Sequence, residues 1–139
     1  MAQKSGISVG AGLRDVLLND QYVSAILGAK GKVYPVVTDE AMLPYIVYRR
    51  LSLASTPTKA RGEGLWDDEV QIEMLCCAPT YAAGVELAER VRKALDGFAG
   101  EVIPNLVVRS CRLVDSEESW QDDAWVQRLV FAVKATMIA

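Results

Sequence analysis

The chain has 139 residues, of which 51% are hydrophobic and 24% are charged, and its formal net charge is −3. This length suits one domain, residues 1–139, that buries about two thirds of the surface of its unfolded chain. The composition excludes an intrinsically disordered protein, which needs few apolar residues and a high net charge. The acidic balance also argues against a protein that binds nucleic acid by neutralising phosphates.

Catalytic chemistry has few candidates in this chain. It contains no histidine, so the usual general base near neutral pH, the serine triad and a histidine metal site are all missing. Two of the three cysteines, Cys76 and Cys77, are neighbours and would point to opposite faces of a strand, which does not suit a disulfide framework. We therefore expect reduced thiols, no catalytic residue, no cofactor and no enzyme activity.

The amino-terminal third predicts helices followed by a short strand. Residues 1–10 carry glycines but no preceding strand or phosphate-binding lysine, so we interpret them as a flexible tail. Apolar residues from Leu13 to Leu27 recur at helical spacing, and Asp20 is a natural N-cap, which predicts two short helices or one bent helix. Residues 33–37 read as a strand, and Pro35 places it at a sheet edge.

Two strands surround a polar arm in the middle of the chain. From Tyr45 onward, alternation predicts a strand with Tyr45, Val47, Leu51 and Leu53 on one face. A second strand, residues 69–77, alternates between an apolar face and a polar face that we expect to be in water. Residues 54–65 between them are predicted to form an exposed loop.

The carboxyl-terminal half predicts a helix and two further strands. Thr80 can cap a helix that runs to Leu95 and ends at Gly97. Its predicted apolar stripe is Tyr81, Val85, Ala88, Val91 and Leu95. Residues 106–114 and 125–138 are rich in β-branched residues, and the acidic segment 115–124 is expected to be an exposed loop between them. The chain is thus predicted to be α+β, with an antiparallel or mixed β-sheet of four to five strands and two helices packed on one face.

Acidic segments leave one catalytic alternative open. Asp67, Asp68 and Glu69 form one cluster, and the segment 115–123 holds five more carboxylates. A small cytosolic enzyme could bind a divalent metal if the two segments met, but their spacing matches no metal-binding loop, and solvated loops are the simpler interpretation. We therefore predict no metal site.

Three tryptophans lie at or beside the predicted loop ends. Trp66, Trp120 and Trp125 combine an apolar ring with a polar N–H, which suits either cover for a sheet edge or an anchor in an interface. The sequence by itself does not choose between these two roles. No segment reaches the roughly 18 consecutive apolar residues of a membrane span, and no apolar signal segment follows Met1, so we expect neither a membrane partner nor export.

The order of these elements resembles one family of phage proteins. The shared features are a helix over residues 20–27, the strand Leu43-Pro44-Tyr45-Ile46-Val47-Tyr48, a polar arm, the strand from Val70 and the helix from Thr80. Over about residues 13–137 this succession is similar to the tail-completion, or tail-terminator, proteins of long-tailed phages. The acidic segment 117–123 departs from the pattern of that family.

The resemblance implies a structural subunit of a phage or prophage, found in the virion and, during assembly, in the host cytoplasm. Such subunits form a ring, commonly a hexamer, on the head-proximal end of the tail tube, and they contact the tube protein and the head-completion or connector protein. DNA passes through the ring without specific binding. Another neck or connector component, and a monomeric binding module, remain alternatives. The interface residues predicted from the arm and the loop ends are Thr58, Lys59, Arg61, Glu63, Trp66, Asp67, Trp120 and Asp122.

Overall fold

A computed structural model of the chain describes residues 5–28, 32–36, 42–57 and 66–137. Its helical elements are a short 3₁₀ helix η1 and three α-helices, and its six strands form one sheet. The bounds, in chain order, are η1 Gly6–Ser8, α1 Val9–Asn19, α2 Gln21–Leu27, β1 Val33–Pro35, β2 Tyr45–Pro57, β3 Trp66–Ala78, α3 Tyr81–Leu95, β4 Gly100–Ile103, β5 Leu106–Gln121 and β6 Ala124–Met137.

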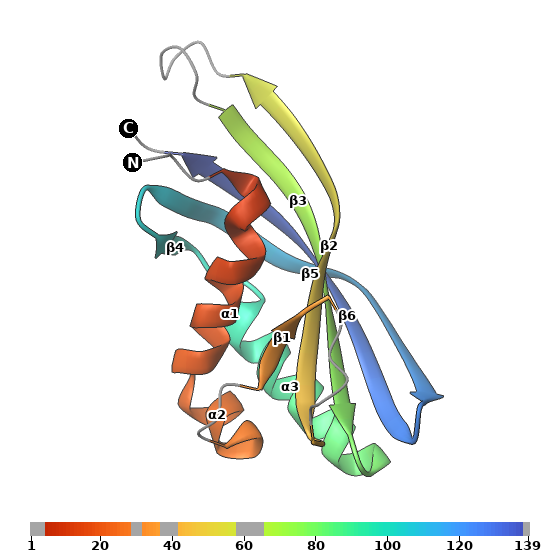
Figure 1. Ribbon diagram of the computed structural model, residues 1–139. Coiled ribbons are helices and arrows are strands. Elements are labelled where there is room, and N and C mark those ends of the chain that lie inside the picture. The colour runs from red at the N-terminus through yellow and green to blue at the C-terminus, as the bar shows by residue number, and fades with distance from the viewer. Residues whose placement is uncertain (1–4, 29–31, 37–41, 58–65, 138–139) are drawn as a thin grey trace.

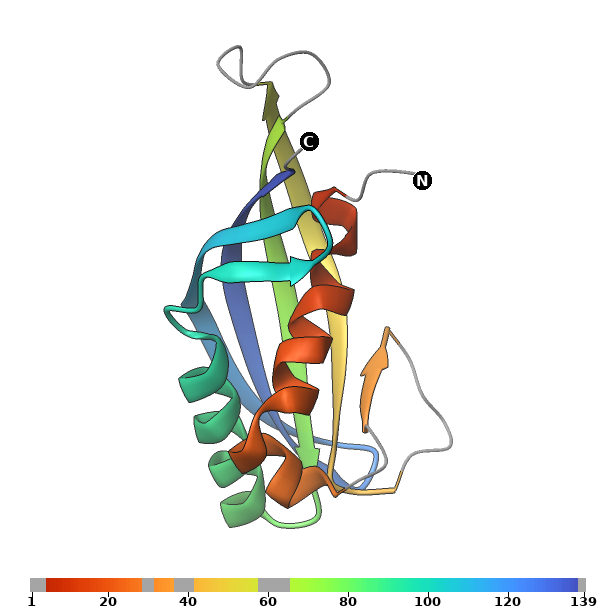
Figure 2. The same cartoon turned by 90° about the vertical axis from the view of Figure 1, so that its left-hand side faces the viewer.

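The sheet has the strand order β1-β2-β3-β6-β5-β4. Among the described strands, the β1–β2 pair is parallel and the other pairs are antiparallel. Of the two predicted arrangements, antiparallel or mixed, the structure therefore has the mixed one. The helices lie together on one face of the curled sheet (Figures 1 and 2). The predicted count of four to five strands is wrong among the described residues, because the four-residue strand β4 is too short to show an alternating pattern.

The predicted break between the first helices is confirmed. Asp20 Oδ1 accepts hydrogen bonds from the backbone N–H groups of Tyr22 and Val23, at 2.9 and 3.0 Å, and so caps α2 where α1 ends. Thr80 caps α3 in the same way, through its Oγ1 and the Ala83 N–H. The described residues therefore contain three α-helices where two were predicted to pack on the sheet, because the bent-helix alternative resolves into two separate helices.

The predicted flexible tail is wrong for residues 5–10. Gly6, Val9 and Gly10 are buried, and they begin η1 and α1. Glycine is needed here for close packing rather than for flexibility: a Cβ on Gly12 would lie 2.5 Å from Val102 Cγ2. Residues 1–4 lie outside the described residues.

The core fills the space between the helices and the inner face of the sheet. Val70, Ile72, Met74 and Cys76 of β3 point into it, as their alternation predicts. The predicted apolar face of β2 is correct at Leu53 but wrong at the start of the strand, where Ile46 and not Tyr45 faces the main core. A β-bulge between Arg50 and Ser52 shifts the alternation, so Ile46 and Leu53 face the same core, although the unbroken pattern put them on opposite faces.

Both predicted loops are shorter than expected. The acidic segment 115–124 is strand almost throughout, because β5 continues to Gln121 and β6 begins at Ala124. Only Asp122 and Asp123 form the turn, with φ of 49° and 59°, a left-handed pair typical of a two-residue hairpin. Residues 54–57, predicted as loop, belong to β2; residues 58–65 lie outside the described residues.

Candidate assembly surfaces

Three aromatic side chains gather at the β5–β6 hairpin tip. Trp120 and Trp125 are cross-strand partners whose ring centroids lie 5.0 Å apart, and the ring of Tyr81, from the first turn of α3, lies 5.5 Å from that of Trp125. Both contacts are edge-to-face, the geometry that the aromatic quadrupole favours. Their exposed fractions are 53%, 36% and 46% for Trp120, Trp125 and Tyr81, so the cluster offers apolar surface to solvent. We call these three residues the aromatic tip.

Glu118 fastens the aromatic tip to the body of the protein. Its Oε2 accepts hydrogen bonds from Gln127 Nε2 at 2.8 Å and from the Tyr81 hydroxyl at 2.9 Å. These two bonds, first that of Gln127 and then that of Tyr81, lower the pKa of Glu118. The bond to the carboxylate in turn raises the pKa of Tyr81. The hairpin and the start of α3 are therefore held together by a charge-assisted hydrogen bond.

A row of charges crosses the face of the sheet opposite the helices. Glu73 on β3 is 5% exposed and lies between Arg49 of β2, at 3.4 Å, and Arg128 of β6, at 2.6 Å. Arg128 reaches on to Asp115 of β5, at 3.3 Å. The expectation that the outer face of β3 is in water is thus wrong at Glu73, because long arginine side chains from both neighbouring strands cover its carboxylate.

The other end of the sheet, where β2 and β3 approach the arm, is tied by polar contacts. The Thr136 hydroxyl accepts a hydrogen bond from Arg109 Nε and donates one to Asp67 Oδ1, both at 2.6 Å. Asp68, on the helix side of β3, accepts the backbone N–H of Gly6 at 2.7 Å and the Ser55 hydroxyl at 2.6 Å. The base of the arm is therefore anchored to β6, to β5 and to the amino-terminal helix.

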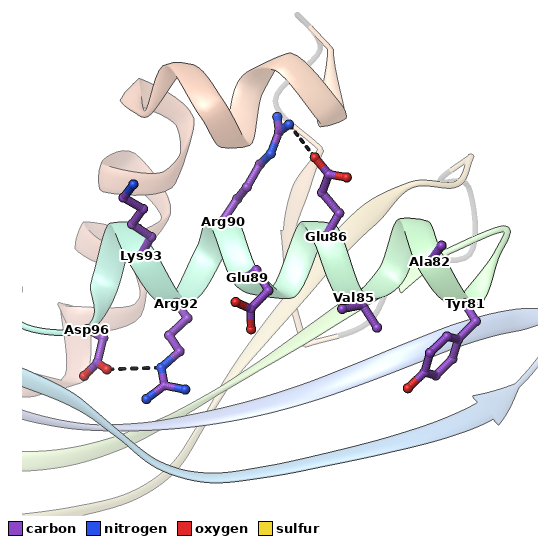
Figure 3. Close-up of a pocket in the computed structure, with 9 residues that line it drawn as sticks. All are labelled: Tyr81, Ala82, Val85, Glu86, Glu89, Arg90, Arg92, Lys93 and Asp96. Carbon is purple, nitrogen blue, oxygen red and sulfur yellow. Dashed lines mark hydrogen bonds and ion pairs between the residues drawn. The ribbon is translucent and has the colours of Figure 1, made fainter.

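The outer surface of α3 carries a shallow, charged hollow (Figure 3). Glu86 and Arg90 form one ion pair across it, at 2.6 Å, and Arg92 and Asp96 form another, at 3.3 Å. Tyr81, Val85, Glu89 and Arg92 point towards the strands, whereas Glu86 and Arg90 point towards α1 and α2 (Figure 3). Four of the six charged side chains that line the hollow are held in these two ion pairs.

Nor do the thiols or carboxylates of the described residues form a reactive site. All three cysteines are free and buried. Burial raises the pKa of Cys77 to about 11 and that of Cys111 to about 12, so both remain protonated thiols near neutral pH. Within the described ranges, no three metal-ligating side chains gather where they could hold an ion. None of the described helices is both long enough and apolar enough to cross a bilayer.

The predicted interface residues fall into separate places. Trp120 and Asp122 lie at the hairpin tip, whereas Asp67 lies at the arm end, about 36 Å away along β6 at ~3.3 Å per residue. Trp66 is the first residue of β3, paired with Pro57. Thr58, Lys59, Arg61 and Glu63 lie outside the described residues. The helical pattern predicts Tyr81 in the core stripe of α3, but Tyr81 is exposed. Its contact with Trp125 depends on how far the β5–β6 hairpin extends, which the sequence pattern does not indicate.

The family match decides what kind of protein this is. Residues 11–138 match the family described as tail completion protein gp17. The chain belongs to this family. Family membership gives it a structural role in a phage tail, and the resemblance inferred from the order of elements is confirmed. No curated protein matches the chain in sequence.

Solved structures support the fold of this tail completion family member. A chain in the virion of a native gene transfer agent particle matches with a TM-score of 0.68 and covers 92% of this chain and 94% of its own length. The sequence identity is 16%, so the likeness shows a shared fold. As a virion component, a tail completion protein contacts other virion proteins.

Proposed function

We propose that this protein caps the head-proximal end of the tail tube and joins the tail to the head as a ring, with six copies as the expected number. The observation that carries the proposal is the family match over residues 11–138. A cap of this kind meets one partner on the tube side and another, a head-completion or connector protein, on the head side. DNA passes through the ring without specific binding, in keeping with the net charge of −3.

The two ends of the sheet suit two different partners. The aromatic tip has rigid, exposed rings, the residue types that dominate binding energy in protein interfaces. The arm end has Asp67 and the segment 58–65 with Thr58, Lys59, Arg61 and Glu63, a polar composition. We assign the arm to the tail tube or a neighbouring subunit, and the aromatic tip to the other partner. Trp66, Trp120 and Asp122 complete this set of contacts.

The proposal is tested by removing the gene from the phage or prophage that encodes it. Electron microscopy of the lysate should then show full heads separated from tails, with tails of irregular length, and supplying the protein in trans should restore joined particles. Tails of uniform length that still carry a terminal ring would contradict the capping function. That outcome would instead support the alternative of a neck component on the head side.

Purified components give a second, direct measurement. The protein is mixed with tail tubes that lack it, and the tube ends are examined by negative-stain microscopy. Capping of one end is expected. The deletion of residues 57–62 should abolish capping if the arm makes the contact, and normal capping by the deletion variant would remove the arm from the proposed interface.

A further inference from the structure

The short edge strands β1 and β4 cover only one half of the long strands next to them, β2 and β5. On β2, the strand β1 pairs with residues 46–48, and no described strand pairs with the outer edge of Arg49–Pro57. On β5, β4 pairs with Leu106–Val108. Further along the same edge, the Gly97 N–H donates to the Cys111 carbonyl, and the Leu113 N–H donates to the Asp96 carboxylate. From Val114 to Gln121 the outer edge of β5 has no described strand beside it. We call these two stretches the β2 open edge and the β5 open edge.

The backbone groups of both open edges can be placed from the register. The Ile46 N–H donates to the Lys32 carbonyl, and the Tyr48 carbonyl accepts from the Val36 N–H. The backbone N–H and C=O groups of every second residue of β2 therefore point away from β3. Continuing that alternation through the β2–β3 register leaves the N–H groups of Arg50, Leu53 and Ser55 pointing outwards. The same reasoning from Leu113 N leaves those of Ser116, Glu118 and Trp120 pointing outwards from β5. No described strand pairs with these outward groups, although the Ser116 N–H donates a local hydrogen bond to Asp115 Oδ1 at 2.9 Å. Each open edge can therefore accept another strand.

The charges of the two edges are complementary. The β2 open edge carries two arginines and no acidic residue, whereas the β5 open edge carries three carboxylates and no basic residue. These charged residues are Arg49 and Arg50 on β2, and Asp115, Glu117 and Glu118 on β5. Three of them, Arg49, Asp115 and Glu118, also have partners within the subunit. Each edge also exposes an apolar side chain, Leu51 at 36% and Val114 at 42%. Solvent-exposed edges are often protected by lysine, and the described residues of these two edges contain none, although each edge has a β-bulge, at Leu51 and at Val114.

The open halves lie at opposite ends of the sheet, and Figure 1 shows the two hairpins extending in opposite directions. Through Val70 and Val133, Leu53 is level with Cys111, so the middle of the β5 open edge lies about 20 Å further along the strands. Each copy adds four strands, β2, β3, β6 and β5, to a continued sheet, so at ~4.8 Å per strand the repeat from copy to copy is about 19 Å across the strands. A sheet continued from copy to copy with that offset has its strands tilted by about 45°, at the upper end of the ~35–45° found in closed β-barrels.

We propose that copies of this chain join edge to edge, with the β2 open edge of one subunit forming an antiparallel pair with the β5 open edge of the next. The contact uses two different edges of each subunit, so it is heterologous and can close into a ring. The strands β1 and β4 act as stops that allow pairing only in the offset register. This inference rests on the proposed ring and assigns the surfaces that form it.

Paired cysteines test the contact. In such a pair, Ala54 would lie in a non-hydrogen-bonded position, where facing side chains are closest, opposite Asp115, Glu117 or Ser119 depending on the register. Three double variants are made, combining Ala54→Cys with Asp115→Cys, Glu117→Cys or Ser119→Cys. Each is oxidised in solution and on capped tail tubes, and then run on a denaturing gel without reductant. The native cysteines are buried and serve as a common background.

One double variant should give a ladder of covalent oligomers that ends at the ring size, and each single variant should give none, because one edge cannot cross-link to itself. The control Ala54→Cys with Lys134→Cys places the second thiol on the same face but on the interior strand β6, and should give no ladder. Rings or capped tubes without a ladder from any of the three variants would overturn the edge pairing and leave the function standing. A wild-type protein that neither caps tubes nor forms oligomers would overturn the function itself.

Discussion

The carboxylate of Asp68 accepts a hydrogen bond from the backbone N–H of Gly6, a residue 62 positions earlier in the chain, at 2.7 Å. The same carboxylate accepts the Ser55 hydroxyl at 2.6 Å, and Asp68 is only 5% exposed. One buried side chain therefore holds η1 and α1 against the arm end of β2 and β3. This places η1 beside the arm end of the sheet.

Replacing Asp68 should destabilise the protein. Asp68→Ala removes the acceptor and leaves the buried Gly6 N–H without a partner, so the free energy of unfolding should fall by about 1–3 kcal/mol. Asp68→Asn keeps one acceptor oxygen and should cost less. Urea unfolding followed by circular dichroism measures both, with Asp15→Ala, at an exposed aspartate on α1, as the matched control. Equal stabilities for Asp68→Ala and the control would show that the hydrogen bonds contribute nothing.

Glu73 should matter more than other carboxylates of the same strand. Glu73→Gln leaves two arginines facing each other across β3 without their shared anion, and we expect a loss of about 1–3 kcal/mol in the free energy of unfolding. Arg49 is partly exposed, which keeps the loss below that of a fully buried charge. Glu69→Gln, an exposed position on the same face, is the control and should change stability by less than about 0.5 kcal/mol. A similar loss in both variants would contradict the role of the charge row.

The aromatic tip should affect assembly more than folding. Trp120→Ala removes one edge-to-face contact from a half-exposed ring, so the free energy of unfolding should fall by only about 1 kcal/mol. Joining of heads to tails, counted by microscopy after complementation, should fall much more steeply. Tyr22→Ala, at an exposed aromatic position on α2, is the control and should support normal joining. Normal joining by Trp120→Ala would exclude the Trp120 side chain from the contact between tail and head.

Acid should loosen the hairpin through Glu118. Hydrogen bonds from Gln127 and Tyr81 lower its pKa in the folded state, so its contribution is present above the ordinary value of 4.5 and is lost as the pH falls through the lowered pKa. Urea midpoints measured from pH 6 down to pH 3 should therefore fall more steeply for the wild type than for Glu118→Gln. Parallel pH profiles would show that Glu118 is not linked to folding.

The cysteines should be silent in the folded protein. Burial raises the pKa of all three thiols, so a thiol reagent at pH 8 should label none of them until urea unfolds the chain. Mass spectrometry should then find three modifications. Rapid labelling of Cys77, the most exposed of the three at 5%, would reveal an opening of the sheet at the end of β3.

Local patterns in the sequence determined much of the fold. Interactions between residues near each other in the chain set the caps at Asp20 and Thr80 and the alternation of β3. The order of the elements, from which the family resemblance was inferred, can be read from the same local patterns. Such features can be predicted because capping and alternation depend on backbone geometry that a few neighbouring residues set.

Only the tertiary structure decided the rest. Polar segments such as 115–121 read as loop, yet they form a strand because β6 supplies a full row of backbone partners and the Asp122–Asp123 turn fits a two-residue hairpin. The bulge that turns Leu53 into the core, and the contact between Tyr81 and Trp125, depend on residues distant in the chain. The half-covered edges of β2 and β5 likewise exist only once six strands are ordered in space, because an unpaired edge is a property of a sheet and not of any strand's own sequence.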